Sequence, residues 1–285
     1  MGRWLTARAT GHEIPWSVTE PDERYHYRAI WLSDIHLGTA GCQAFYLLDF
    51  LRNHKSDTLY LVGDILDGWQ LRKGWYWPQA HNDVVQKILR VARKGTRVVY
   101  VPGNHDSLSR QFIGLSFGGI EVAEEAIHTT AKGLRLWVTH GDLFDGVMQH
   151  ARWLAHLGSV LYELLLKLNR HMNSVRLRLG LPYWSMSQYV KHQVKNAVSF
   201  ITQFEEVMTA EARRRNCDGV VCGHIHKAEI RTIDGLLYCN DGDWVESMTA
   251  LVETFEGELQ LVHWRSRLSA PLNLGRVDEV NVAAA

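Results

Sequence analysis

Five apolar runs of this chain end directly in residue types that bind metal ions. The run from Thr58 to Val62 is rich in Leu, Tyr and Val and leads through Gly63 to a carboxylate, Asp64. A strand of this composition can be buried on both faces, and ligands of open α/β sheets collect outside the carboxyl ends of such strands. We therefore interpret Asp64 as a ligand that two metal ions share.

The other four runs end in the same way. They are the apolar segments 29–32, 98–101, 134–139 and 218–222. The polar blocks that follow them are Asp34-Ile35-His36, Gly103-Asn104-His105-Asp106, His140-Gly141-Asp142 and Gly223-His224-Ile225-His226. A single Asp or His after a strand is usually a turn or capping residue. Five strand ends that carry only ligand-type residues, in this order, point instead to one metal site.

From Tyr27 onward the pattern alternates between strand and helix, with helices expected at about 43–53 and 82–94. Such alternation predicts a parallel sheet with helices on its faces. Two hairpins, turned by Asp234-Gly235 and Glu256-Gly257, suggest a second sheet that is antiparallel or mixed. We expect an α/β fold in which the two sheets pack face to face with helices outside.

Charge and periodicity divide the chain. Residues 147–204 carry seven Lys or Arg against one Glu, although the whole chain has a net charge of +0. Apolar residues between Trp153 and Leu168 recur at three- and four-residue steps, which predicts an amphipathic helix. We expect an N-terminal arm at residues 1–25 and a core formed by residues 26–146 and 217–267. An inserted helical cap is expected at 147–216 and a C-terminal tail at 268–285.

Composition limits the partners and the compartment. The 285 residues, 46% of them hydrophobic, suffice for a large core, and the neutral net charge argues against a nucleic-acid partner. The four cysteines form no C-x-x-C pair and residues 1–25 contain no apolar signal segment, so we expect a cytoplasmic protein with reduced thiols. The basic, amphipathic cap is expected to contact an anionic membrane surface peripherally.

The ligand types suit hard or borderline divalent ions, and two such ions about 3.5–4 Å apart clamp both oxygens of a phosphoryl displacement. Residues two apart in an extended segment project to the same side, so Asp34 and His36 are expected to reach one ion together. Asp64 and His226 complete that site. The second site is expected to consist of Asp64, Asn104, His140 and His224.

The ordered blocks resemble those of the calcineurin-like metallophosphoesterases, from about Ile30 to Asp243. The resemblance implies a four-layer α/β/β/α sandwich of two mixed sheets and two divalent ions, Mn²⁺ first, with Fe or Zn also compatible. It further implies that the ions activate a water for attack on phosphorus. His105 would then stabilise developing charge or protonate the leaving oxygen, and Asp67 would orient the His105 imidazole.

Within that superfamily the chain looks most like the UDP-2,3-diacylglucosamine diphosphatases. The similarity lies in the segment from Asp64 to Trp69, the Thr139–Asp142 block, the helical insertion and Gly242-Asp243-Trp244. Those enzymes cleave a nucleotide-linked lipid into UMP and a lipid monophosphate, so a small-molecule or lipid-linked nucleotide is the expected substrate. One feature departs from the branch, because Gly103-Asn104-His105-Asp106 replaces the usual G-N-R-D.

Three alternatives accompany this interpretation. A phosphodiesterase or phosphatase acting on soluble nucleotides, nucleic-acid ends or phosphoproteins would use the same metal site. A non-catalytic scaffold with the same fold usually lacks ligands, whereas all seven ligand positions are filled here. A metallo-β-lactamase-like hydrolase is disfavoured because its H-x-H-x-D-H block is absent.

Overall fold

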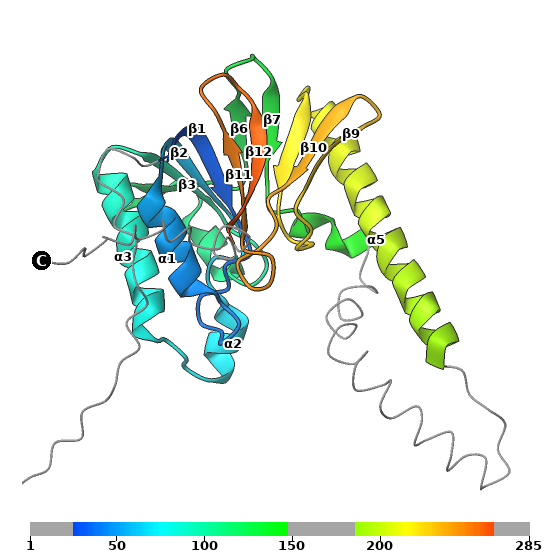
Figure 1. Ribbon diagram of the computed structural model, residues 1–285, viewed down its shortest axis with the longest axis horizontal. Coiled ribbons are helices and arrows are strands. Elements are labelled where there is room, and N and C mark those ends of the chain that lie inside the picture. The colour runs from blue at the N-terminus through cyan, green and yellow to red at the C-terminus, as the bar shows by residue number, and fades with distance from the viewer. Residues whose placement is uncertain (1–24, 148–185, 265–285) are drawn as a thin grey trace, which may run out of the picture.

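The computed structural model of this protein describes residues 25–147 and 186–264, and within them two sheets lie back to back (Figure 1). The first sheet has seven strands in the order β12-β11-β1-β2-β3-β5-β4. Their bounds are β1 Tyr25–Leu32, β2 His54–Val62, β3 Arg97–Val101, β4 Ser116–Phe117, β5 Ile120–Val122, β11 Thr249–Glu253 and β12 Leu259–His263.

The second sheet has five strands in the order β6-β7-β8-β10-β9. Their bounds are β6 Ala126–Thr129, β7 Arg135–Val138, β8 Gly219–Cys222, β9 Glu229–Ile233 and β10 Leu236–Asn240. Both sheets contain parallel and antiparallel pairs. Buried side chains of both sheets, such as Trp31 and Val62 of the first and Val138 and Val221 of the second, form one apolar cluster between them.

Helices cover the outer faces, which completes the predicted four-layer sandwich (Figure 1). The helices α1 (Ala44–Asn53) and α3 (Gln79–Arg93) bury Leu47, Phe50 and Val84 against the first sheet. The helix α5 (Met186–Arg214) lies along the second sheet, where its Phe204 and Met208 are fully buried. Short helical turns occupy the loops between strands: α2 (Gly68–Lys73), η1 (Ser107–Phe112) and η2 (Asp142–Val147).

One expectation about the hairpins is wrong. The hairpin turned by Asp234-Gly235 does join β9 to β10 in the second sheet, but the Glu256-Gly257 hairpin belongs to the first sheet. Its strand β11 pairs antiparallel with β1, and Ala29 lies opposite Glu253. The turn sequence specifies a hairpin but not the strand beside which it pairs, because that choice depends on burial over a long sequence separation.

The segment predicted as a cap contributes to the core. The last turns of α5 form the outer helical layer of the second sheet, because Phe204, Met208 and Ala212 pack against Trp137 and Tyr238. The amphipathic stretch between Trp153 and Leu168, the N-terminal arm up to residue 24 and the tail from residue 265 lie outside the described residues. Among the helices in the described ranges, none combines the length and the hydropathy needed to cross a membrane.

Strand register brings the predicted ligand loops together. In the first sheet Leu32 lies opposite Leu61, and Val62 lies opposite Val101, so β1, β2 and β3 end at one edge. In the second sheet β7 and β8 run parallel and end side by side. A bond between the two sheets joins these edges, because the His140 ring donates through Nδ1 to the Val62 carbonyl at 2.8 Å.

Candidate metal centre

The loop after β1 carries Asp34 and His36, and both have left-handed backbone conformations, with φ of 48° and 53°. The expectation that they share an extended segment is therefore wrong. The loop is fixed instead by backbone hydrogen bonds to the β2 loop, including His36 N to the Asp64 carbonyl at 2.9 Å. Even so, the side chains converge, with His36 Nε2 3.9 Å from Asp34 Oδ1. Positive φ at non-glycine residues is costly and is typical of functional loops.

Asp64, which also has a positive φ of 53°, lies at the centre of the cluster. Its Oδ2 is 4.0 Å from His36 Nε2, 3.4 Å from His140 Nε2 and 3.9 Å from His105 Nε2. Its Oδ1 accepts the backbone N–H of His105 at 2.8 Å. One carboxylate oxygen thus faces imidazoles from three different loops, which is the arrangement expected of a bridging ligand.

Three groups of ligand-type atoms lie at or beside Asp64 in the described residues, and one of them consists of His36, Asp64 and His105. On one side Asp34, His36 and His226 have ligand atoms within 4.8 Å of one another, and His226 Nε2 lies 3.0 Å from Asp34 Oδ1. On the other side Asp64 itself groups with His140 and His224. The two ring nitrogens His140 Nε2 and His224 Nδ1 lie 3.3 Å apart, close enough to face one ion.

Asn104 completes the predicted set of seven, and it lies between two residues that are bonded to the cluster. The N–H of Gly103 donates to Asp106 at 2.6 Å, and the N–H of His105 donates to Asp64. The loop after β3 therefore reaches the same edge as the other four. The structure thus brings the five predicted loops together, while the role of each side chain as a metal ligand stays a prediction.

The orientation of His36 tests whether these residues fit a cation. Its Nδ1 donates to Asp67 Oδ2 at 3.1 Å, while its buried Nε2 has no hydrogen-bond partner. That nitrogen faces the oxygens of Asp34 and Asp64, each about 4 Å away. A ring held through one nitrogen with the other presented to carboxylates is typical of a metal-ligating histidine. His140, held through Nδ1 by Val62, has the same arrangement.

Glycines allow the loops to approach this closely. A Cβ added at Gly63, where φ is 77°, would overlap the His140 ring, and a Cβ added at Gly103 would overlap Asp64 Oδ1. Glycine is the residue that adopts positive φ freely and leaves this space open. The donor set and the space around it both fit divalent ions, for which carboxylate and imidazole ligands are suited.

Neighbouring charges in the cluster shift the pKa values of its carboxylates and imidazoles. Burial raises the pKa of Asp64, but nearby His140 outweighs it and lowers the pKa to about 2. Burial disfavours a charged His140, yet Asp64 and Asp34 raise its pKa to about 10. The carboxylate of Asp34 likewise overcomes burial and raises the pKa of His226 to about 9. Without metal, His140 and His226 therefore hold protons at neutral pH, and a cation must displace them.

Asp67 contacts both a predicted ligand and the predicted catalytic histidine. Its Oδ2 lies 3.1 Å from His36 Nδ1 and 3.0 Å from His105 Nδ1, while its Oδ1 caps α2 by accepting the Gln70 N–H at 2.8 Å. Burial disfavours ionisation of Asp67, but the hydrogen bonds to His105 and His36 hold its pKa well below the usual range. The His105 ring also packs against Trp69, with centroids 4.1 Å apart.

Comparison with known proteins agrees with this geometry. A profile of the calcineurin-like phosphoesterases matches residues 27–228, most of the chain, including the five loops. The chain belongs to this family. Membership implies a hydrolase that uses divalent metals, and the His and Asp clusters around Asp64 are their candidate ligands.

Several curated relatives carry the name UDP-2,3-diacylglucosamine hydrolase. The protein from Photorhabdus laumondii is 24% identical over 72% of this chain and 84% of its own length. The protein from Neisseria meningitidis serogroup A is 28% identical over 76% of this chain and 89% of its own length. Among solved structures, the Escherichia coli phosphoesterase YfcE is 16% identical and covers 82% of this chain and 98% of its own, with a TM-score of 0.39.

Three buried residues support the metallophosphoesterase site although the sequence pattern assigned them no role. Asp106 closes its own loop through Gly103 and also accepts the N–H of Ile65 at 2.8 Å, so it joins the β2 and β3 loops. Ser33 Oγ lies 2.6 Å from Asp34 Oδ2 and 2.7 Å from Asp241 Oδ1. Asp241 follows β10 directly, so the rule that singled out the other five strand ends also applies to it.

Proposed function

We propose that this metallophosphoesterase hydrolyses the diphosphate of UDP-2,3-diacylglucosamine, or of a similar nucleotide-linked lipid, to UMP and a lipid monophosphate. The observation that carries the proposal is the similarity to UDP-2,3-diacylglucosamine hydrolases over 72% to 78% of the chain, together with the Asp64-centred cluster of ligand-type residues. The identity of 24% to 28% supports the reaction class more strongly than it supports the lipid.

Two divalent ions, when bound by Asp34, His36, Asp64, Asn104, His140, His224 and His226, supply Lewis acidity and a reactive water at neutral pH. We propose Mn²⁺ as the resident ion. The chain's own residues contribute the protons and the orientation. Asp67 Oδ2 lies 3.0 Å from His105 Nδ1, and His105 Nε2 lies 3.9 Å from Asp64 Oδ2, so Nε2 is the ring nitrogen that faces the cluster.

From that position His105 can donate a proton from Nε2 to the oxygen of the leaving group. The Trp69 ring packs on the imidazole and limits its rotation, which keeps Nε2 directed at the site. A positioned acid of this kind contributes about 10²–10⁴-fold to turnover. The same Asp67 oxygen also orients His36, so one carboxylate supports both a metal ligand and a proton donor.

His105 also favours the alternative substrate class. It occupies the position where the lipid branch commonly has arginine, and histidine is the general form of the superfamily. A phosphodiesterase or phosphatase of soluble nucleotides or phosphoproteins is therefore the second candidate. We propose that the cap holds the acyl chains and contacts an anionic membrane; it lies mostly in residues 148–185, outside the described structure.

The test compares two substrates that differ only in their lipid. Purified, Mn²⁺-loaded protein is assayed for UMP release from UDP-2,3-diacylglucosamine and from UDP-N-acetylglucosamine, which lacks the long acyl chains. The proposal predicts a kcat/KM for the acylated substrate higher by on the order of 10²-fold, because several buried methylenes contribute about 0.8 kcal/mol each. Equal kcat/KM values on both substrates would support the soluble-nucleotide alternative and remove the lipid.

A further inference from the structure

Exposed aromatic side chains follow the β2 ligand loop. Trp75 is 77% exposed and Tyr76 is 46% exposed, and both lie in the short connection between α2 and α3. Large aromatic residues are usually buried on folding, so two adjacent exposed ones mark a surface that meets another apolar phase or partner. We call the segment 69–77 the aromatic loop.

The aromatic loop packs next to the ligand loop that carries His36, at the end of the first sheet where the ligand loops lie; we call this end the metal edge. Trp77 and Tyr76 pack edge-on against His81, with ring centroids 5.6 Å and 5.8 Å away. His81 is buried, and its Nδ1 accepts the N–H of Gly38, two residues after His36, at 3.0 Å. The exposure of Trp75 is thus a property of an anchored segment whose inner residues are held next to the ligand loop.

The charges beside these aromatics have one sign. Residues 68–82 contain Arg72 and Lys73 but no Asp or Glu, and both basic residues are exposed at the end of α2. Tryptophan and tyrosine prefer the boundary between lipid and water, where each ring has one apolar and one wet side. Lysine and arginine near such a boundary are attracted to anionic headgroups. A protein partner would not require this particular pairing.

A second apolar feature lies at the same edge. Phe45, in the first turn of α1, is 67% exposed, and α1 begins directly after the loop that carries Asp34 and His36. The helix α1, after the first ligand loop, and the connection between α2 and α3, after the second, therefore both present aromatic rings to solvent. In Figure 1 the α2 end of the molecule is the lower left end, where α1 and α3 also begin.

We propose that the aromatic loop is an interfacial anchor that seats the metal edge on an anionic lipid bilayer, with Trp75 and Tyr76 inserted among headgroups and Arg72 and Lys73 contacting phosphate. This inference rests on the proposed function, because a lipid-linked nucleotide remains in the membrane and the site must come to it. It differs from contact through the cap, since the loop leads into α3 on the first sheet, whereas α5, the described part of the cap, lies along the second sheet.

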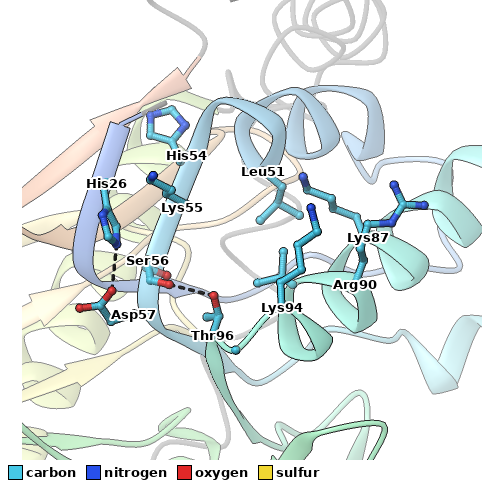
Figure 2. Close-up of a pocket in the computed structure, with 12 residues that line it drawn as sticks. His26, Leu51, His54, Lys55, Ser56, Asp57, Lys87, Arg90, Lys94 and Thr96 are labelled. Atoms are coloured by element: carbon cyan, nitrogen blue, oxygen red, sulfur yellow. Dashed lines mark hydrogen bonds and ion pairs between the residues drawn. The ribbon is translucent and has the colours of Figure 1, made fainter. Parts of the chain in front are cut away.

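The opposite edge of the first sheet supplies a matched control. A hollow there, between the start of β2 and the end of α3, is lined by the basic residues Lys55, Arg90 and Lys94 (Figure 2). Basic residues near the C-terminus of a helix complement its dipole, and Arg90 lies in the last turn of α3 while Lys94 is its C-cap. They carry the same charge as Arg72 and Lys73, and the sequence around them, residues 86–96, contains no tryptophan or tyrosine.

The experiment is vesicle flotation of the full-length, metal-loaded protein. One set of vesicles contains phosphatidylcholine and phosphatidylglycerol in equal parts, and the other contains phosphatidylcholine alone. The variants are Trp75→Ser with Tyr76→Ser, Arg72→Gln with Lys73→Gln, and the control Arg90→Gln with Lys94→Gln. Hydrolysis of soluble bis(p-nitrophenyl) phosphate, unchanged in all three, shows that each variant is folded.

We expect the wild type to float with the anionic vesicles. The aromatic variant loses about tenfold in partitioning, the effect of withdrawing two rings from the interface, and the Arg72 and Lys73 variant loses about tenfold on anionic vesicles only. The control stays close to wild type. Absence of wild-type binding, full binding by the aromatic variant, or an equal loss in the control would each overturn the anchor.

These outcomes are separate from those of the substrate comparison. Flotation that depends on Trp75 and Tyr76, combined with equal kcat/KM on acylated and unacylated nucleotides, would remove the proposed substrate and leave the anchor standing. Preference for the acylated nucleotide without flotation would do the reverse.

Discussion

Replacing Asp67 with asparagine isolates the charge that this carboxylate supplies. Asparagine has the same shape and serves equally well as an N-cap, so the hydrogen bond from Gln70 to Oδ1 should survive and α2 should stay folded. The variant loses the negative charge that faces His105 at 3.0 Å and His36 at 3.1 Å. Because the pKa of Asp67 lies well below its usual range, the wild-type residue is ionised throughout the neutral pH range.

The expected losses in kcat and in metal affinity follow from the contacts of Asp67 with His105 and with His36. A hydrogen bond to a charged partner contributes about 1.5–3 kcal/mol, and ~1.4 kcal/mol corresponds to a factor of ten. Loss of the His105 contact should lower kcat about 10–100-fold, and loss of the His36 contact should weaken one metal ion by about 10–100-fold. At saturating metal the first effect remains and the second disappears.

The assay measures kcat at saturating Mn²⁺ on two phosphodiesters, one with a p-nitrophenolate leaving group and one with an alkoxide leaving group. A proton donor matters more for the poor leaving group, so Asp67→Asn should slow the alkyl ester more than the nitrophenyl ester. His105→Ala, which leaves the metal ligands in place, should show the same selective loss. Equal slowing of both esters, or wild-type turnover of the alkyl ester, would refute the role assigned to the pair.

Four further predictions concern the pH dependence of the metal site, the pH dependence of stability, Gly63 and Glu253. Divalent-ion affinity should rise between about pH 6 and pH 9, with proton release seen by calorimetry in two buffers, because His140 and His226 have pKa values of about 10 and about 9 without metal. These pKa values are raised, so stability of the metal-free protein should also fall as pH rises from about 6.5 to about 9–10. Affinity independent of pH would contradict the first statement, and an unfolding midpoint of the metal-free protein that does not change over this range would contradict the second. Gly63→Ala should lose metal content and lower the Tm, since its Cβ would overlap His140 at a φ of 77°; a fully loaded variant would count against the site. Glu253→Gln should cost about 1.5–3 kcal/mol of unfolding free energy in urea denaturation with kcat unchanged, because buried Glu253 of β11 pairs with Arg28 of β1 and joins the first sheet to His128 of the second; an unchanged unfolding midpoint would contradict it.

The parallel strands and their ligand loops could be predicted from sequence because each loop follows its strand directly. A buried apolar run defines a strand, and the carboxyl ends of parallel strands share an edge, so the polar blocks after β1, β2 and β3 had to meet, as did those after β7 and β8. That inference needs no knowledge of the loop backbone. It therefore held even though Asp34 and His36 are not in extended conformation. That the two groups face one another depends on how the two sheets pack.

Contacts between segments that lie far apart in the sequence were harder to predict from sequence patterns. The pairing of β11 with β1 joins residues more than two hundred positions apart, and the Glu256-Gly257 turn does not encode it. Asp106 was visible in the sequence, but its bond to Ile65 depends on how closely the β2 and β3 loops approach. Ser33 and Asp241 are likewise linked only in the folded chain.

The most direct test of the central claim is anomalous diffraction from crystals of the full-length protein reconstituted with Mn²⁺. We expect two peaks about 3.5–4 Å apart on either side of the Asp64 carboxylate, and loss of both in Asp64→Ala. One side should be bounded by Asp34, His36 and His226, and the other by Asn104, His140 and His224. A single peak, peaks away from Asp64, or two peaks retained in Asp64→Ala would contradict it.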